Sequence, residues 1–146
     1  MEKTRVLVID DDPNLRRTLS DILKAKGYEA HSAKDGAEGL ALLERHQVSV
    51  ALVDLQLPGI SGLELLARIR SDYPSTEVII LTGNSELEMA EKAIQLGAVN
   101  YITKPFEPAL LREVVLSSLR GAEGGKKAGD RPWQLKEKNA NIVPSV

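Results

Sequence analysis

Short apolar runs rich in branched side chains alternate with helix-period segments along most of this chain. Runs of this kind lie at residues 5–9, 28–32, 48–53, 78–81 and 100–103. Strands that alternate with helices are typical of a parallel sheet, because parallel neighbours must be joined by a crossover connection. The sequence therefore predicts an α/β fold built from five strand–helix units, (βα)5.

The strands are predicted to lie in the middle of the fold. Val6–Ile9 and Val50–Val53 are apolar at every position, which indicates burial on both faces of the sheet. Right-handed crossovers then give a doubly wound, five-stranded parallel sheet. The first helix has Asp12 as its N-cap, Pro13 at its first position and Gly27 as its stop. Further helices are expected at about 36–46, at 62–72, before Gly97 and from Pro108 onward.

Composition bounds the class of protein. With 146 residues the chain suits one domain, expected at 1–120, followed by a linker or C-terminal tail at 121–146. No run of 18 or more apolar residues occurs and the first residues lead directly into a strand, so we expect a cytoplasmic protein with no membrane span. Residues 1–120 carry four net negative charges and aromatic residues are 3%, which argues against direct nucleic-acid binding by this chain. The absence of cysteine excludes thiol chemistry.

Polar residues follow the apolar runs at one predicted edge of the sheet. Asp10 and Asp11 follow the first run, Asp54 the third, Thr82 the fourth, and Lys104 the fifth. In open α/β sheets the ligand crevice lies beyond the carboxyl ends of the strands. If the strand order is 2-1-3-4-5, the first and third strands are neighbours, and the three acids converge.

Converging carboxylates need a counter-charge. Two of them about 4 Å apart repel by roughly 4 kcal/mol at an effective dielectric near 20. A hard divalent ion relieves this repulsion, and oxygen ligands favour Mg²⁺, with Mn²⁺ as an alternative. Thr82 can donate its hydroxyl hydrogen to a phosphoryl oxygen, and Lys104 can supply a compact positive charge. An aspartate between them can act as the nucleophile and form an acyl phosphate.

The motifs at these positions resemble those of the receiver domain of two-component response regulators over about residues 4–120. They are the acidic pair after Val-Leu-Val-Ile, the segment Val-Asp-Leu-Gln-Leu-Pro-Gly around residue 54, Leu-Thr-Gly at 81–83, and Tyr-Ile-Thr-Lys-Pro-Phe at 101–106. The resemblance implies that Asp54 is the phosphoacceptor. It also implies a metal site in which Asp11 binds directly, Asp10 binds through water, Asp54 contributes its carboxylate and Gln56 its main-chain carbonyl.

The resemblance further implies a flavodoxin-like fold with strand order 2-1-3-4-5. Thr82 and Lys104 would bind the phosphoryl group, Thr82 and Tyr101 would form the switch, and the Lys104–Pro105 peptide bond would be cis. Such a domain is a conformational switch rather than an enzyme. Its implied partners are a histidine kinase or histidine phosphotransferase, and an output domain or partner protein that contacts the fourth helix, fifth strand and fifth helix. A homodimer is a further option.

Two other functions are weighed against this one. A Mg²⁺-dependent phosphatase with a nucleophile on the first strand would need Asp-x-Asp-x-Thr, but Asp10-x-Asp12-x is followed by Asn14 where that pattern requires threonine. A flavodoxin-type electron carrier would need a hydroxyl- and glycine-rich phosphate loop where this chain has three acids. His31 and His46 are isolated in the sequence and lack metal-ligand spacing, so they are predicted to be surface or packing residues.

Overall fold

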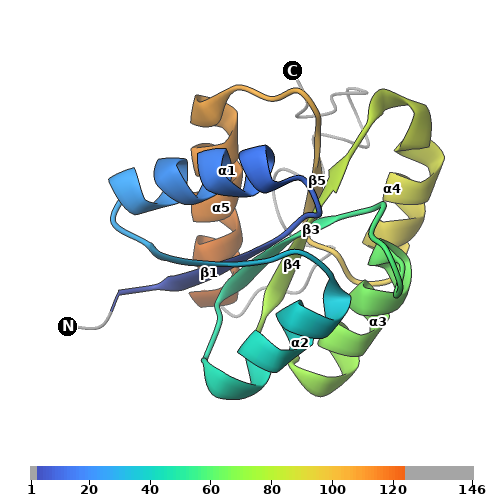
Figure 1. Cartoon of the computed structure of the whole chain (residues 1–146), viewed down its shortest axis with the longest axis horizontal. Coiled ribbons are helices and arrows are strands. Elements are labelled where there is room, and N and C mark those ends of the chain that lie inside the picture. Colours follow the sequence, from blue (N-terminus) through green and yellow to red (C-terminus); the bar gives the residue numbers. More distant parts are fainter. Residues whose placement is uncertain (1–2, 124–146) are drawn as a thin grey trace.

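The computed structural model describes residues 3–123, which form one parallel five-stranded sheet covered on both faces by helices (Figure 1). The strands are β1 (Arg5–Ile9), β2 (Glu29–Ala33), β3 (Val50–Asp54), β4 (Glu77–Thr82) and β5 (Asn100–Thr103). The helices are α1 (Pro13–Ala25), α2 (Gly36–Arg45), α3 (Gly62–Asp72), a 3₁₀ turn η1 (Asn84–Glu86), α4 (Leu87–Gln95) and α5 (Pro108–Glu123). The strand order is β2-β1-β3-β4-β5, which confirms the predicted doubly wound α/β fold.

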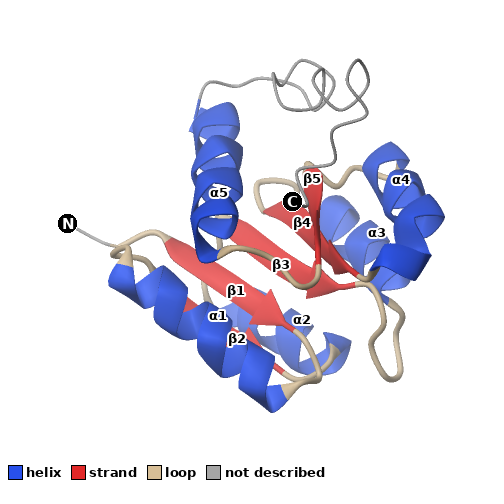
Figure 2. Cartoon of the chain, turned by 90° about the horizontal axis from the view of Figure 1, so that it is seen from above, coloured by secondary structure: helices blue, strands red, loops and turns tan. Residues whose placement is uncertain are grey.

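Helices pack on the sheet (Figure 2), and the buried apolar side chains form two separate layers. Helices α1 and α5 pack on one face, around Leu19, Leu23 and Val115. Helices α2, α3 and α4 cover the other face, around Leu65, Ile69 and Ala93. Successive strand residues point to opposite faces, so every strand position in the middle of the sheet contributes to one layer or the other. This explains why the central strands β3 and β4 are buried along their whole length.

The predicted helix signals act where they were expected. The Asp12 carboxylate accepts hydrogen bonds from the first backbone N–H groups of α1, and Pro13 opens that helix. Gly27 has φ +99°, a left-handed conformation that favours glycine and ends the helix. Several boundaries differ from the prediction by one or two residues. Strand β2 spans 29–33 instead of 28–32, β3 spans 50–54 instead of 48–53, and β4 spans 77–82 instead of 78–81. Helix α5 continues to Glu123, three residues into the predicted linker or tail.

Glycine at the start of α3 brings this helix against the end of β3. A Cβ atom on Gly62 would lie 2.6 Å from the carbonyl oxygen of Asp54 and 2.7 Å from the Cα atom of Leu55. Real Cβ atoms do not approach backbone atoms so closely, so only glycine allows this packing. The backbone that carries Asp54 is therefore fixed by the first turn of α3.

Within residues 3–123, no helix combines the length and apolar character that a membrane span requires. The predicted linker or tail at 121–146 lies outside the described residues from position 124 onward.

Candidate functional site

The three predicted acids converge at the carboxyl edge of the sheet. Asp10 follows β1 and Asp54 ends β3, and these strands pair directly, with Ile9 opposite Val53. One carboxylate oxygen from each of Asp10, Asp11 and Asp54 lies within 4.8 Å of the others. Asp10 is fully buried and Asp54 nearly so, whereas Asp11 is exposed. The cluster therefore has a buried floor and an open side that faces solvent.

Local hydrogen bonds orient Asp10. Its carboxylate accepts the backbone N–H of Asp12 at 2.9 Å, and its main-chain carbonyl accepts a hydrogen bond from the Arg16 guanidinium at 2.7 Å. Arg16 was not singled out from the sequence. It lies six positions along the chain, on the second turn of α1, and its reach back over the first turn carries no motif that sequence reasoning could have used.

Lys104 supplies the positive charge of the site. Its ammonium Nζ lies 2.9 Å from Oδ2 of Asp10 and 3.3 Å from Oδ2 of Asp54. The Lys104–Pro105 peptide bond is cis, and the backbone N–H of Lys104 donates to the carbonyl oxygen of Thr82 at 2.7 Å. The loop after β5 is thus attached to the end of β4, with the lysine side chain directed to the acids.

The burial of the site shifts the pKa values of its charged groups. Desolvation raises the pKa of Asp54 to about 6, and the charge of Asp10 adds to this rise. The Lys104 ammonium and the backbone N–H of Gln56 oppose the rise without cancelling it. Burial alone would lower the pKa of Lys104, but the hydrogen bond to Asp10 and the charges of both acids outweigh it, so that pKa is raised.

The other predicted residues lie around the acids in different roles. The backbone N–H of Gln56 donates to Oδ1 of Asp54 at 3.2 Å. Thr82 is fully buried at the end of β4, and its hydroxyl donates to the carbonyl oxygen of Gly83 at 3.2 Å. Tyr101 is 5% exposed and belongs to the layer under α2, α3 and α4. Tyr101 therefore lies in the interior on strand β5.

Glu86 is a second residue that the sequence did not reveal. Its Oε1 accepts the backbone N–H of Gly83 at 3.0 Å, next to Thr82. Its Oε2 is buried, and no hydrogen-bond partner for this oxygen lies among the described residues. The short turn η1 holds this carboxylate, and a turn of three residues leaves no periodic signal in a sequence.

The two histidines, which lie apart in the sequence, meet in the structure. The sequence predicted His31 and His46 to be surface or packing residues, and their rings stack with centroids 4.4 Å apart. Strand β2 and the end of α2 bring them together across 15 positions of chain, and Glu29 joins them. Contact between two such elements depends on tertiary packing, so spacing along the chain could not show it. Neither histidine belongs to the acid cluster, as predicted.

The donor set of the acid cluster fits Mg²⁺. Its side-chain donors are all carboxylate oxygens, the ligand type that hard divalent ions prefer. Three carboxylates and one lysine leave two negative charges when all are ionised, which matches a divalent cation. The exposed side at Asp11 leaves room for the waters and phosphate oxygens that complete an Mg²⁺ octahedron.

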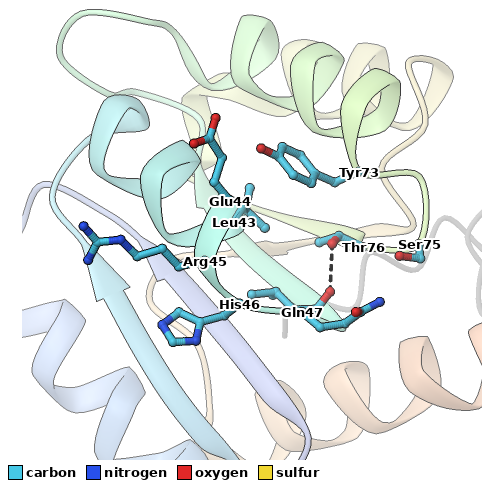
Figure 3. A pocket seen from close by; sticks show the side chains of 9 residues that line it. Leu43, Glu44, Arg45, His46, Gln47, Tyr73, Ser75 and Thr76 are labelled. Atoms are coloured by element: carbon cyan, nitrogen blue, oxygen red, sulfur yellow. Dashed lines mark hydrogen bonds between the residues drawn. The ribbon is translucent and has the colours of Figure 1, made fainter.

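A separate pocket lies away from these residues (Figure 3). It has a volume of about 300 Å³ and is lined by the end of α2, the loop before β3 and the segment between α3 and β4. The Thr76 hydroxyl donates to the carbonyl oxygen of Val48 at 2.7 Å, and both residues line the pocket. Its lining includes none of the predicted site residues, so the pocket marks the opposite, amino end of the strands.

Buried acids, a lysine and a threonine at the carboxyl edge of a 2-1-3-4-5 sheet define a phosphoryl-accepting signalling module. The model of the response regulator receiver domain family matches residues 6–116, and the chain belongs to this family. It is thus a receiver domain, the phospho-accepting switch of two-component systems, as the motifs indicated. Receiver domains bind Mg²⁺ at an acidic pocket, and they act generally as switches rather than enzymes.

Similar proteins of known structure or name support this family membership. The chain is 34% identical to a CheY-like receiver domain protein of Methanospirillum hungatei JF-1, whose crystal structure matches with a TM-score of 0.81 over 85% of this chain and 99% of that one. It is 30% identical to sporulation initiation phosphotransferase F of Bacillus subtilis, covering 79% of this chain and 93% of that protein.

Other relatives are longer proteins. The regulatory protein AtoC of Escherichia coli is 35% identical over 80% of this chain, and the match spans 25% of AtoC. For the response regulator protein PilR of Pseudomonas aeruginosa, the identity is 34% and the match covers 27% of that protein. The chain thus spans about a quarter of the length of these two relatives.

Proposed function

We propose that Asp54 is the residue of this receiver domain that accepts the phosphoryl group. Its carboxylate is 9% exposed and lies 3.3 Å from the Lys104 ammonium, at the end of a strand whose backbone is held by α3. Asp10 is also bound to Lys104, but it is fully buried, so an incoming phosphoryl group has no open path to it. The position of Asp54 beside Lys104 and below the open side of the cluster carries the proposal.

The proposed reaction moves a phosphoryl group between two carrier residues. A carboxylate oxygen of Asp54 attacks phosphorus in line, an O–P bond forms, and the P–N bond of a phosphohistidine on a histidine kinase or histidine phosphotransferase breaks. The electron pair of that bond returns to the donor imidazole, which takes up a proton. Positioning supplies most of the catalysis, because the protein forms no bond of its own to phosphorus other than that of Asp54.

We assign the metal ligands to the acids around Asp54. Asp11 and Asp54 would hold Mg²⁺ through their carboxylates, Asp10 would hold it through water, and Gln56 would contribute its main-chain carbonyl. The bound ion supplies charge neutralisation for the transferring group. Asp10 also keeps Lys104 in place, since its Oδ2 accepts the shorter of the two lysine contacts.

The response to phosphorylation is proposed to leave the site through Thr82 and Tyr101. The new group brings about −1.5 to −2 charges and three acceptor oxygens. Thr82 would turn its hydroxyl from the Gly83 carbonyl to a phosphoryl oxygen, and Tyr101 would repack in the space released. Thr82 and Thr103 pair across β4 and β5, so a movement of Thr82 reaches the strand of Tyr101 directly.

We propose that α4, β5 and α5 form the surface that an output domain or partner protein reads. The large apolar side chains that are most exposed among residues 3–123 all lie on its two helices: Met89 and Leu96 on α4 or at its end, and Leu116 on α5. Apolar side chains on a polar surface favour contact with another protein. Alternatively, a second copy of this chain binds the same surface and forms a homodimer.

Labelling with a small phosphodonor tests the assignment of Asp54. The wild-type chain incubated with acetyl phosphate and Mg²⁺ should gain one phosphoryl group by intact mass, and the group should be lost in alkali as an acyl phosphate is. Asp54→Asn should remain unlabelled, and the matched control Asp72→Asn, an exposed aspartate on α3, should label as the wild type does.

Two results would contradict the proposal. One is full labelling of a folded Asp54→Asn variant. The other is continuous release of inorganic phosphate with no labelled protein, which would indicate a phosphatase instead.

A further inference from the structure

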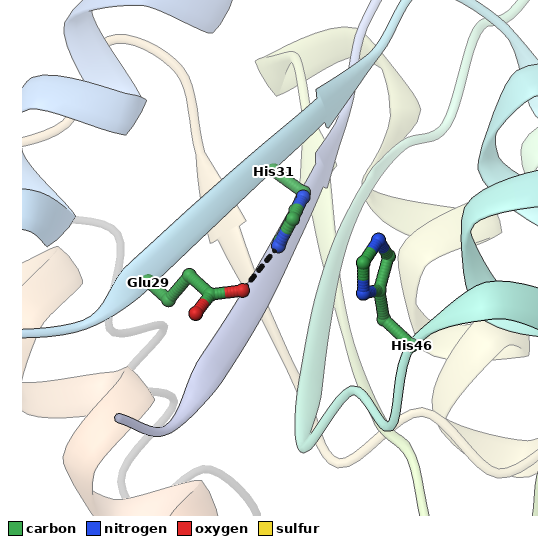
Figure 4. A group of neighbouring side chains, drawn as sticks. All are labelled: Glu29, His31 and His46. Atoms are coloured by element: carbon green, nitrogen blue, oxygen red, sulfur yellow. Dashed lines mark hydrogen bonds and ion pairs between the residues drawn. The ribbon is translucent and has the colours of Figure 1, made fainter. Parts of the chain in front are cut away.

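A second cluster of metal-binding side chains lies on edge strand β2 and the end of α2 (Figure 4). Nε2 of His31 lies 2.6 Å from Oε2 of Glu29, and the ring of His46 stacks on that of His31 at 4.4 Å with an interplanar angle of 29°. One ligand atom from each of the three residues lies within 4.8 Å of the others. These are two imidazoles and one carboxylate that converge on one small volume.

The topology explains why these residues meet. Glu29 and His31 are two positions apart on β2, so both point to the same face of the sheet. The register pairs His31 with Leu7, which belongs to the layer under α2. Helix α2 ends at Arg45, and its C-cap His46 lies over that face. Because β2 is an edge strand, the cluster is open to solvent, and the His31 and Glu29 side chains are 23% and 38% exposed.

We propose that Glu29, His31 and His46 bind a divalent transition-metal ion, with Zn²⁺ as the expected type. Two histidines and one glutamate form a donor set that zinc accepts in three positions, with water in the fourth. The set differs from the acid cluster in chemistry, because imidazole nitrogen favours zinc, copper and nickel, whereas Mg²⁺ favours oxygen alone. The two sites should therefore sort their ions by ligand type.

A packing role alone explains the convergence of the three side chains less well than metal binding does. The stacked rings place two imidazoles, each of which has a nitrogen that can act as a ligand, beside the Glu29 carboxylate. In tetrahedral coordination with metal–ligand distances near 2.0–2.1 Å, ligand atoms lie about 3.3 Å apart. Binding would bring the ligand atoms from a spread of up to 4.8 Å to this value by side-chain rotation, which the partial exposure of the three residues allows.

Arg5 completes the surroundings of the cluster. Its Nε donates to Oε2 of Glu29 at 2.8 Å, the same oxygen that faces His31. A carboxylate has two oxygens, so one can bind the ion while the other keeps the arginine, an arrangement in which an outer partner orients a ligand. The positive charge of Arg5 repels the bound cation, so we expect a dissociation constant for Zn²⁺ in the micromolar range rather than a smaller one.

Histidine NMR gives a direct test, because His31 and His46 are the only histidines in the chain. Zn²⁺ is titrated into ¹⁵N-labelled protein in the presence of excess Mg²⁺, which occupies the acid cluster. The imidazole resonances of both residues should shift together and saturate at one equivalent. If either ring fails to respond, the three-ligand site is wrong.

Calorimetry of Zn²⁺ binding to variants supplies the second arm. His31→Gln, His46→Gln and Glu29→Gln should each weaken Zn²⁺ binding by at least ~10-fold. Glu44→Gln, an exposed glutamate on α2, is the matched control and should keep the wild-type affinity. Asp11→Asn should likewise leave it unchanged.

The variants also separate this site from adventitious binding. Circular dichroism must show that each variant is folded. A folded variant of any of the three ligands that keeps the wild-type affinity would overturn the assignment. A loss of Zn²⁺ binding in Asp11→Asn would overturn it as well, by moving the ion to the acid cluster.

Discussion

Two carboxylates of this molecule are paired with cations, yet their pKa values move in opposite directions. Asp54, at the carboxyl edge of the sheet, lies beside Lys104, and its pKa is raised to about 6. Glu29, on edge strand β2, lies beside His31 and Arg5, and its pKa is lowered. The presence of a cationic neighbour therefore does not decide the shift.

Burial decides it. Desolvation is the largest cause at Asp54, and the second acid, Asp10, adds to it. At Glu29 the hydrogen bond from His31 is the largest cause, followed by that from Arg5, and desolvation is smaller than either. At the buried site, the negative charge of Asp54 is unfavourable unless a bound cation balances it or phosphorylation replaces the free carboxylate. The edge site holds a carboxylate that is already ionised and satisfied.

The largest expected effect on stability comes from disturbing the contact between the start of α3 and the end of β3. Gly62→Ala places a Cβ atom against the backbone of Asp54 and Leu55, which must shift. We expect the free energy of unfolding to fall by about 1–3 kcal/mol, as for other overpacked positions. Urea denaturation measures this. The histidine resonances of the edge cluster should not move, because that cluster lies on edge strand β2, which β1 separates from β3.

Gly83→Ala is the matched control for that change, since its Cβ would meet only Oε1 of Glu86 at 3.5 Å, an ordinary contact. Equal losses of stability in Gly62→Ala and Gly83→Ala would show that close approach to the strand end is not the cause.

A smaller effect of opposite sign is expected from Asp54→Asn. The folded protein holds the Asp54 proton more tightly than the unfolded chain does, so this carboxyl contributes most to stability in acid, and its contribution is lost as pH rises through about 6. Removing the charge at pH 7 without metal should therefore raise the free energy of unfolding by about 1–2 kcal/mol.

Urea denaturation of wild type and Asp54→Asn from pH 4 to pH 8 checks the sign. The difference should vanish toward pH 4, where Asp54 is protonated in the wild type. A stabilisation that stays constant across this range would show that desolvation of the charge is not its source.

The smallest expected effect separates the two neighbours of Glu29. Arg5→Gln should raise the pKa of Glu29 toward its ordinary value, but by less than His31→Gln does, because the hydrogen bond from His31 is the larger cause. Carbon-13 NMR of the glutamate carboxyl group measures both. The pKa of Asp54 should stay at about 6 in each variant. The reverse order of the two variants would contradict this ranking.

Much of the fold could be predicted from the sequence because the information is local and periodic. Apolar runs such as Val6–Ile9 encode buried parallel strands, and Asp12 with Pro13 encodes the start of α1. The convergence of Asp10 and Asp54 also followed, because parallel strands of a doubly wound sheet all end at one edge.

The remaining features depend on side chains that meet across elements. His46 reaches His31 only because α2 packs over β2, and Arg16 reaches the Asp10 carbonyl only through the turn of α1. The close approach at Gly62 likewise depends on the angle at which α3 enters. No pattern along the chain encodes these distances.

The division of the interior by the sheet has a consequence for how the domain can change over time. Neighbouring residues of one strand, such as Ile79 and Ile80, belong to different layers, the first under α1 and α5 and the second under α2, α3 and α4. Each layer can therefore be rebuilt by substitution while the other stays as it is. Because α4 and α5 lie in different layers, substitutions in one layer change one side of the proposed partner surface and leave the other side as it is.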